Sequence, residues 1–263
     1  MKNRCVAGCW RRFGQVWLGA ALASVLFAAC TETVKQPKVS PERELTNRYN
    51  LAQVYLSQGR AKEAIPLLEE VTRRDPKHAG AHNLLGVVYW SLGQTQRARD
   101  EYERSLEIDP YLTDARVNLG VLFSEAEDYE RAREEFQLAL EDRTYISPEK
   151  PLVNLAVNDI KLGHPREALV RTEEAIRRNP LYTPAYRVFV DALRQADPEV
   201  AGVEYRTLTR ELARSQDFHL NLGEAFLKKD DSRRARFHLE KAVEINPSSV
   251  QAGQARKVLD TIR

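Results

Sequence analysis

The amino-acid sequence predicts an all-α fold built from helix pairs that repeat along the chain. Four of the places where an acidic or amide residue precedes proline are separated by about 34 residues or about twice that length. These points are Asp75-Pro76, Asp109-Pro110, Asn179-Pro180 and Asn246-Pro247. Apolar residues between them recur at helical intervals. Gly and Pro each number only 12 among 263 residues, which excludes a collagen-like or proline-rich chain.

One window shows the complete repeat pattern, with bulky, small and chain-breaking residues at fixed intervals. Its members are His82, Leu85-Gly86, Tyr89, Ala98, Tyr102 and Pro110. The pattern resembles that of the tetratricopeptide repeat. The resemblance implies a right-handed superhelical solenoid of about six repeats followed by a C-terminal capping helix. The expected repeats are 45–78, 79–112, 113–146, 149–182, 183–215 and 216–249, and the capping helix is 250–263.

The pattern has a packing reason. Small residues such as Gly86, Ala98 and Gly120 allow two helices to approach closely, and the proline ends the second helix of each unit. A single pair cannot bury its apolar face, so stability has to come from stacking against neighbouring pairs.

Two units depart from the pattern. In the fifth, Gly202 and Arg206 stand where alanine and a bulky apolar residue are expected, and Asp197-Pro198 interrupts the unit. We therefore treat the fifth unit as degenerate and expect a kink or a loosened seam there. The third unit lacks its closing proline, and Ser147-Pro148 adds two residues. A longer turn is expected over 142–150.

The first 29 residues differ in composition from the rest. Four basic residues and no acidic one occur before residue 13, and an uncharged run then ends in Ala28-Ala29. This order is typical of a secretory signal peptide that is removed on export. A retained membrane helix is the alternative, since about 17 residues is the short limit for crossing a bilayer.

The end of this segment, Leu26-Phe27-Ala28-Ala29-Cys30, resembles the lipobox of bacterial lipoproteins. The resemblance implies a lipid anchor, such as palmitate, on Cys30 and places the protein at the outer membrane with its body in the periplasm. In the alternative, Cys30 is an ordinary residue at the cleavage site and the protein is free in the periplasm. Residues 30–44 contain Pro37 and Pro41 and no apolar periodicity, which is typical of an extended tether.

Charge and motifs exclude several functions. Lys and Arg number 40 against 38 Asp and Glu, a balance that argues against nucleic-acid binding. No nucleophile, phosphate-loop or zinc-protease motif occurs, so we expect no enzyme activity, cofactor or small-molecule substrate. His78 and His82 have a spacing that zinc can use but lack a third ligand, and a structural role is expected rather than a metal site.

The family resemblance also implies a binding surface. In tetratricopeptide proteins the first helix of each repeat lines a concave groove, and the corresponding positions here are apolar in repeats one to four. These residues are Tyr49, Leu56, Val87, Trp90, Val117, Val121, Val153, Val157 and Ile160. Trp90 is the expected anchor for a protein partner. The alternative is that several of the valines only pack between neighbouring first helices.

Asparagines recur at one repeat position, in four of the six units. They are Asn50, Asn118, Asn154 and Asn221. In some tetratricopeptide superhelices, such asparagines form a ladder that binds an extended peptide backbone, because an amide donates and accepts hydrogen bonds at once. Asparagine at this position for local structural reasons remains the alternative.

A lipobox, a tether and about six repeats together resemble the type IV pilus secretin pilotin family (the Tgl, PilF and PilW group). Membership would imply a lipoprotein that binds secretin subunits and promotes their assembly for type IV pilus biogenesis and twitching motility. The alternatives are an envelope scaffold that recruits peptidoglycan hydrolases or outer-membrane assembly proteins, and an enzyme accessory or a cryptic hydrolase.

Overall fold

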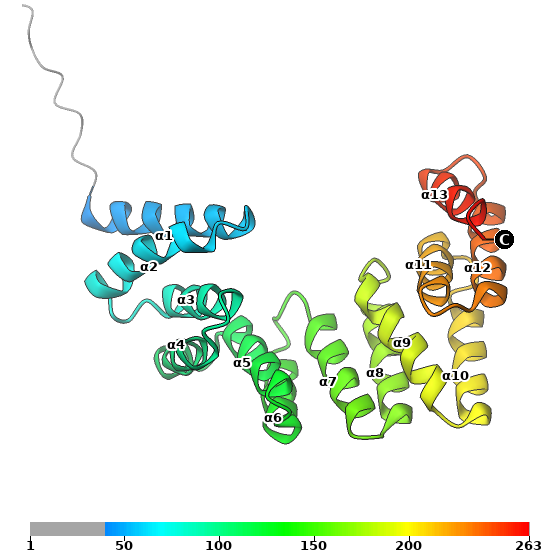
Figure 1. Cartoon of the computed structure of the whole chain (residues 1–263), viewed down its shortest axis with the longest axis horizontal. Helices are drawn as coiled ribbons and strands as arrows, with labels where there is room; N and C mark the ends of the chain where they lie inside the picture. The colour runs from blue at the N-terminus through cyan, green and yellow to red at the C-terminus, as the bar shows by residue number, and fades with distance from the viewer. Residues whose placement is uncertain (1–39, 263) are drawn as a thin grey trace, which may run out of the picture. The chain divides into compact units, whose positions relative to one another are not determined.

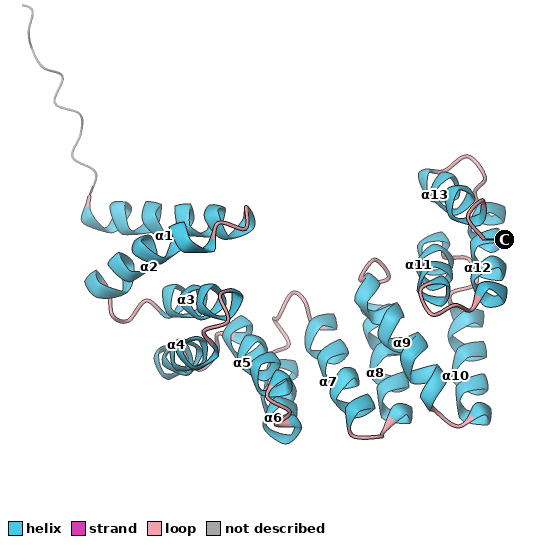
Figure 2. Ribbon diagram, in the orientation of Figure 1, coloured by secondary structure: helices cyan, strands magenta, loops and turns pink. Residues whose placement is uncertain are grey.

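The computed structural model describes residues 40–262, and this part of the chain contains 13 α-helices and no strand (Figures 1 and 2). The helices are α1 (Pro41–Ser57), α2 (Ala61–Arg74), α3 (Ala79–Ser91), α4 (Thr95–Ile108), α5 (Thr113–Glu125), α6 (Tyr129–Glu141), α7 (Glu149–Lys161), α8 (Pro165–Arg178), α9 (Thr183–Gln195), α10 (Pro198–Glu211), α11 (Gln216–Leu227), α12 (Ser232–Ile245) and α13 (Val250–Leu259). The all-α prediction is confirmed for these residues. None of these helices is both long and apolar enough to traverse a lipid bilayer. The signal segment, the lipobox with Cys30 and the tether up to residue 39 lie outside the described residues.

The helices are arranged as consecutive pairs that pack on their neighbours along the sequence. Within pairs, α3 packs on α4, α5 on α6, α7 on α8 and α11 on α12. Second helices also pack on the first helix of the next pair, as α4 does on α5 and α8 on α9. The pairs inside the stack thereby bury apolar surface against both neighbours, and α13 packs on α12 at the C-terminal end.

Short turns connect the two helices of each pair. The turns 58–60, 92–94 and 162–164 each have a glycine at their centre with positive φ, between 73° and 79°. The same place in the turn 126–128 is occupied by Glu127 with φ 62°. Because a residue with a Cβ is strained in this region, the repeated glycine is the local reason for a tight reversal.

Close contact between the two helices of a pair depends on residues without a side chain. A Cβ at Gly86 would lie 2.4 Å from the ring of Tyr102, and one at Gly120 would lie 2.6 Å from the ring of Phe136. Both rings are fully or almost fully buried. The aromatic ring of the second helix therefore occupies the space that glycine leaves on the first.

The structure corrects the register predicted for the fifth unit, whereas the loose packing expected there agrees with the sparse contact between α9 and α10. The turn between α9 and α10 has two residues, 196 and 197, instead of three, and Asp197 caps α10 by accepting hydrogen bonds from the Glu199 and Val200 amides. The one-residue shortening shifts the register, so that the small and bulky positions are filled by Ala201 and Tyr205 rather than by Gly202 and Arg206. Asp197-Pro198 is thus the start of a helix and not a break within one.

Two further boundaries bear on the sequence predictions. The first helix begins at Pro41, so residues 41–44 are helical and the predicted tether is too long at its C-terminal end. Ser40 explains the start, because its Oγ accepts a hydrogen bond from the Arg43 amide at 3.3 Å and proline suits the first helical position. The expected long turn is confirmed: seven residues, 142–148, separate α6 from α7.

The buried apolar side chains form two clusters. One includes residues of α1 to α6 together with Leu155 of α7, and the other includes Leu152 of α7 and residues of α8 to α13. The helix α7 thus contributes to both, next to the longest turn.

Gly120→Ala is expected to destabilise the fold by about 1–3 kcal/mol, because the added methyl group would overlap the ring of Phe136. Urea unfolding followed by circular dichroism measures the change. The matched control is Gly253→Ala in α13, where no atom lies within 4 Å of the added Cβ. There the free energy of unfolding should rise by roughly 0.5–1 kcal/mol from helix propensity. Equal effects of the two substitutions would contradict the packing argument.

Candidate functional site

The residues predicted to line a binding groove lie on the first helices of the first four pairs. We call them the first-helix strip: Tyr49 and Leu56 on α1, Val87 and Trp90 on α3, Val117 and Val121 on α5, and Val153, Val157 and Ile160 on α7. Seven of the nine are partly or substantially exposed, and Trp90 is the most exposed, at 41%. An apolar strip with accessible side chains therefore exists on these helices.

Two members of the strip are corrected by the structure. Val117 is 6% exposed and Val153 is 4% exposed, and both belong to the buried clusters. They pack within the stack, as the alternative interpretation of the valines proposed, and they leave almost no surface for a partner.

Trp90 is held in place by the next pair. Its Nε1–H donates a hydrogen bond to Oε2 of Glu125 on α5 at 2.7 Å. Ser124 makes an analogous contact, donating from Oγ to Oδ1 of Asn158 on α7 at 2.5 Å. Polar side chains near the ends of the first helices thus connect successive pairs. For Trp90, this satisfies the indole N–H and leaves part of the ring available for apolar contact.

Tyr49 is positioned by the start of α3. Its ring packs on the His78 ring with centroids 4.8 Å apart. Its Oη lies so close to Gly80 that a Cβ on that residue would be 2.9 Å from it. Burial, followed by the charge of Asp114, raises the pKa of Tyr49 above its ordinary value, so the ring stays neutral at physiological pH.

The asparagine series is divided between exposed and internally bonded members. Asn118 donates from Nδ2 to Oδ1 of Asn83 at 3.0 Å, and Asn221 donates to the carbonyl oxygen of Pro180 at 3.1 Å. Asn50 is exposed and Asn154 is half-buried. Two of the four amides are therefore already engaged in contacts between pairs through Nδ2, which fixes their orientation and leaves their Oδ1 atoms as the acceptors for a peptide.

The two histidines singled out by their spacing have local partners. Nδ1 of His78 accepts a hydrogen bond from the Ala81 amide and caps α3. Nδ1 of His82 lies 2.7 Å from Oε2 of Glu101 on α4. Residues 40–262 contain no group of three or more histidine, cysteine or acidic side chains placed to hold a metal ion.

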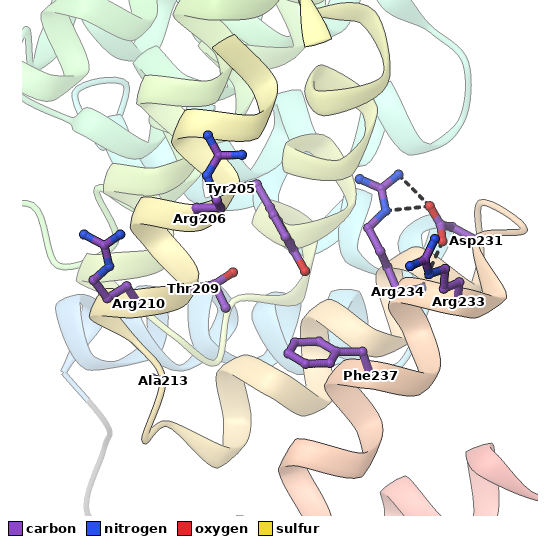
Figure 3. Close-up of a pocket in the computed structure, with 9 residues that line it drawn as sticks. All are labelled: Tyr205, Arg206, Thr209, Arg210, Ala213, Asp231, Arg233, Arg234 and Phe237. Carbon is purple, nitrogen blue, oxygen red and sulfur yellow. Dashed lines mark hydrogen bonds and ion pairs between the residues drawn. The ribbon is translucent and has the colours of Figure 1, made fainter. Parts of the chain in front are cut away.

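A second surface, which the sequence analysis missed, lies between α10 and α12. It is a cleft of about 910 Å³ whose walls come from these two helices (Figure 3). Its lining residues are Tyr205, Arg206, Thr209, Arg210, Ala213, Asp231, Arg233, Arg234 and Phe237. The register error in the fifth unit hid it, because Arg206 was assigned to a core position. The signal in the sequence is the pair of arginines four residues apart, which places both on one helix face.

A directional hydrogen-bond chain lies behind this cleft. His219 Nε2 faces the Ala213 carbonyl oxygen at 3.2 Å, His219 Nδ1 faces His238 Nδ1 at 2.8 Å, and His238 Nε2 faces Tyr205 Oη at 2.8 Å. Because a carbonyl only accepts, His219 Nε2 must donate, and its neutral Nδ1 must accept from His238. Tyr205 O–H then donates to His238 Nε2. One tautomer of each ring satisfies the whole chain, which joins α10, α11 and α12.

Both histidines are kept neutral by their surroundings. They are at most 2% exposed. Burial is the main cause that lowers the pKa of each, and with the added effects of His219 and Arg234 it lowers the pKa of His238 to about 3. The chain of hydrogen bonds requires the neutral rings, so geometry and electrostatics agree.

A carboxyl pair joins α8 and α10. Glu173 is 4% exposed, and burial, reinforced by the neighbouring Glu204, raises its pKa to about 7. Its Oε2 accepts a hydrogen bond from Arg177 at 2.9 Å. The buried Oε1 has no hydrogen-bond partner when the carboxyl group is ionised. A proton on Oε1 that is donated to Glu204 would satisfy this atom.

The fold and the repeated contacts define an α-helical repeat protein. Residues 49–112 match one sequence model of the tetratricopeptide repeat, and residues 113–141 and 216–249 match another. No curated protein matches the sequence.

Solved structures share the fold. The chain is similar to pilF of Pseudomonas aeruginosa, with a TM-score of 0.60 and 21% identity, over 82% of this chain and 98% of that one. It is similar to PilW, a type IV pilus biogenesis factor, with a TM-score of 0.55 at the same identity and coverage. A chain of the APC/C Cut9–Hcn1 hetero-tetramer gives a TM-score of 0.56 and 15% identity, over 83% of this chain and 43% of that one. At such identities the likeness shows the fold alone.

His238→Leu is expected to make stability less sensitive to acid. The folded-state pKa values of both histidines lie below the unfolded value of about 6.5, so the unfolded state binds more protons as pH falls below that value. Wild-type stability should therefore decline between about pH 6.5 and pH 4. Urea unfolding across this range should show a shallower decline for the variant, although it is less stable at pH 7.5. Parallel curves would contradict neutral burial of the pair.

Glu173→Gln tests a contribution to stability whose pH dependence is opposite to that of the buried histidines. The folded-state pKa of Glu173 lies above the unfolded one, so its contribution to stability is present in acid and is lost as pH rises toward 7. At pH 8 the amide can still donate to Glu204, and the variant should be more stable than wild type by roughly 1–2 kcal/mol. Glu174→Gln, at an exposed carboxylate paired with Arg178, is the control and should change stability by less than about 0.5 kcal/mol.

Proposed function

We propose that this chain is an outer-membrane lipoprotein that binds secretin subunits and promotes their assembly for type IV pilus biogenesis. The observation that carries the proposal is the first-helix strip with Trp90 at 41% exposure. A partly exposed aromatic residue among accessible apolar side chains is a typical anchor for a protein partner.

The mechanism combines anchoring with temporary shielding. A lipid on Cys30 would keep the protein at the membrane surface, where secretin subunits insert, and so raise the effective concentration of the two partners. Subunits of an oligomeric pore expose apolar surface before they assemble, and such surface aggregates readily. The strip would cover a secretin segment until a neighbouring subunit replaces it.

Two further observations support the proposal. The segment Leu26–Cys30 resembles a lipobox. The likeness to pilF and PilW extends over 98% of each of those chains, whereas only 43% of the Cut9–Hcn1 chain is matched. The helical fold is therefore shared over nearly the whole length of the two pilus proteins.

The double variant Trp90→Ala and Val121→Glu is expected to reduce heat-resistant secretin oligomers by about tenfold or more, because it removes the anchor and places a charge on the strip. The assay uses cells that lack the gene and are complemented with each variant, with immunoblotting of secretin oligomers. Val170→Glu is the matched control: Val170 is 55% exposed but lies on α8, a second helix outside the strip.

Membrane fractionation and thermal unfolding would establish that each variant is present and folded. Normal oligomers with the double variant would exclude the strip as the secretin site. Normal oligomers in the deletion strain itself would exclude the pilotin function and favour an envelope scaffold, whose partner a pull-down from solubilised envelopes would identify.

Direct binding of a secretin segment can be followed by tryptophan fluorescence. Trp90 is the only tryptophan after residue 17, so a form beginning at Thr31 emits from Trp90 alone. A secretin segment that docks on the strip should shift this emission to shorter wavelength as water leaves the ring.

A further inference from the structure

The cleft between α10 and α12 carries positive charge that the protein itself does not neutralise. Arg206 and Arg210 lie one turn apart on α10, and Arg233 lies on the facing helix (Figure 3). None of these three forms an ion pair with a carboxylate of residues 40–262. The acidic residue in the lining, Asp231, is engaged by Arg234, whose Nε lies 2.6 Å from Oδ2.

The floor of the same cleft is apolar and aromatic. Phe237 is 46% exposed at the surface of α12, and the Tyr205 ring stands edge-on to Phe226 with centroids 5.9 Å apart. The hydrogen bond from Tyr205 Oη to His238 holds this ring in position. Guanidinium groups therefore surround a fixed apolar surface.

We infer that this cleft binds an extended acidic peptide segment that carries an aromatic or branched aliphatic side chain. The guanidinium groups are spread along both walls and do not converge on one point (Figure 3), an arrangement that fits several separate carboxylates better than one phosphate. Arginine binds carboxylates through paired hydrogen bonds, and the apolar side chain would rest between Tyr205 and Phe237.

The volume of about 910 Å³ is at the upper end of the range of ligand pockets, about 300–1,000 Å³. The chain's own segment 31–39 is not the complementary occupant, because it carries Lys35 and Lys38 against a single acidic residue, Glu32. The site lies on second helices of the last two repeats, so it is separate from the first-helix strip and does not depend on the proposed function.

The test measures fluorescence anisotropy of a labelled peptide, Asp-Glu-Phe-Asp-Glu-Leu-Asp-Glu, added to the full chain in detergent. Binding to wild type is expected, and the double variant Arg206→Glu and Arg233→Glu should weaken it by about tenfold or more. Phe237→Ser should weaken it as well. The control Arg143→Glu changes an exposed arginine in the turn after α6 and should leave binding unchanged.

Each result decides the inference. Loss of binding in both cleft variants, with retained binding in the control and unchanged circular dichroism in all of them, supports it. The inference is overturned if the peptide fails to bind, if the cleft variants bind it as wild type does, or if the Asn/Gln analogue of the peptide binds equally well. It is also overturned if phosphatidylglycerol vesicles, and not the peptide, bind in a manner that depends on Arg206 and Arg233, since the site would then recognise a lipid surface.

Discussion

The close approach of the two helices in each pair is the constraint on which the rest of the structure depends. At Gly86 and Gly120 the first helix has no side chain, and the rings of Tyr102 and Phe136 fill that space. Both rings are buried, and the helices that carry them also pack on the next pair, α4 on α5 and α6 on α7. The position of every surface residue follows from this geometry, since it fixes which face of each helix points away from its neighbours.

The helix pairs could be predicted from the sequence because their signals are local: glycine in tight turns, proline after second helices, and apolar residues at helical intervals. The error in the fifth unit arose because the turn 196–197 is one residue shorter than the others, so a fixed period misplaces the positions of α10 by one. Burial of Val117 and Val153 was not predictable in the same way. It depends on how neighbouring first helices meet, which spacing does not encode. The partners of Trp90 and Asn118, on adjacent repeats, were hidden for the same reason.

Buried polar groups join the helices from α8 to α12. The paired histidines in α11 and α12 are stable when neutral, and Glu173 beside Glu204 is stable when protonated. Their contributions to stability change in opposite directions with pH, so they oppose each other in the range between about pH 4.5 and pH 6.5 where both change. These groups also fix Tyr205 and α10, which form one wall of the arginine-lined cleft. The cleft is therefore built on a polar core of defined geometry.

The division of the apolar core at α7 has a mechanical consequence. Leu155 belongs to the first cluster and Leu152 to the second, so both clusters meet on one helix. In a linear array, neighbouring units are coupled through the interfaces that they share. A force that pulls α7 out of one cluster would therefore also loosen the other, because the same helix is packed into both.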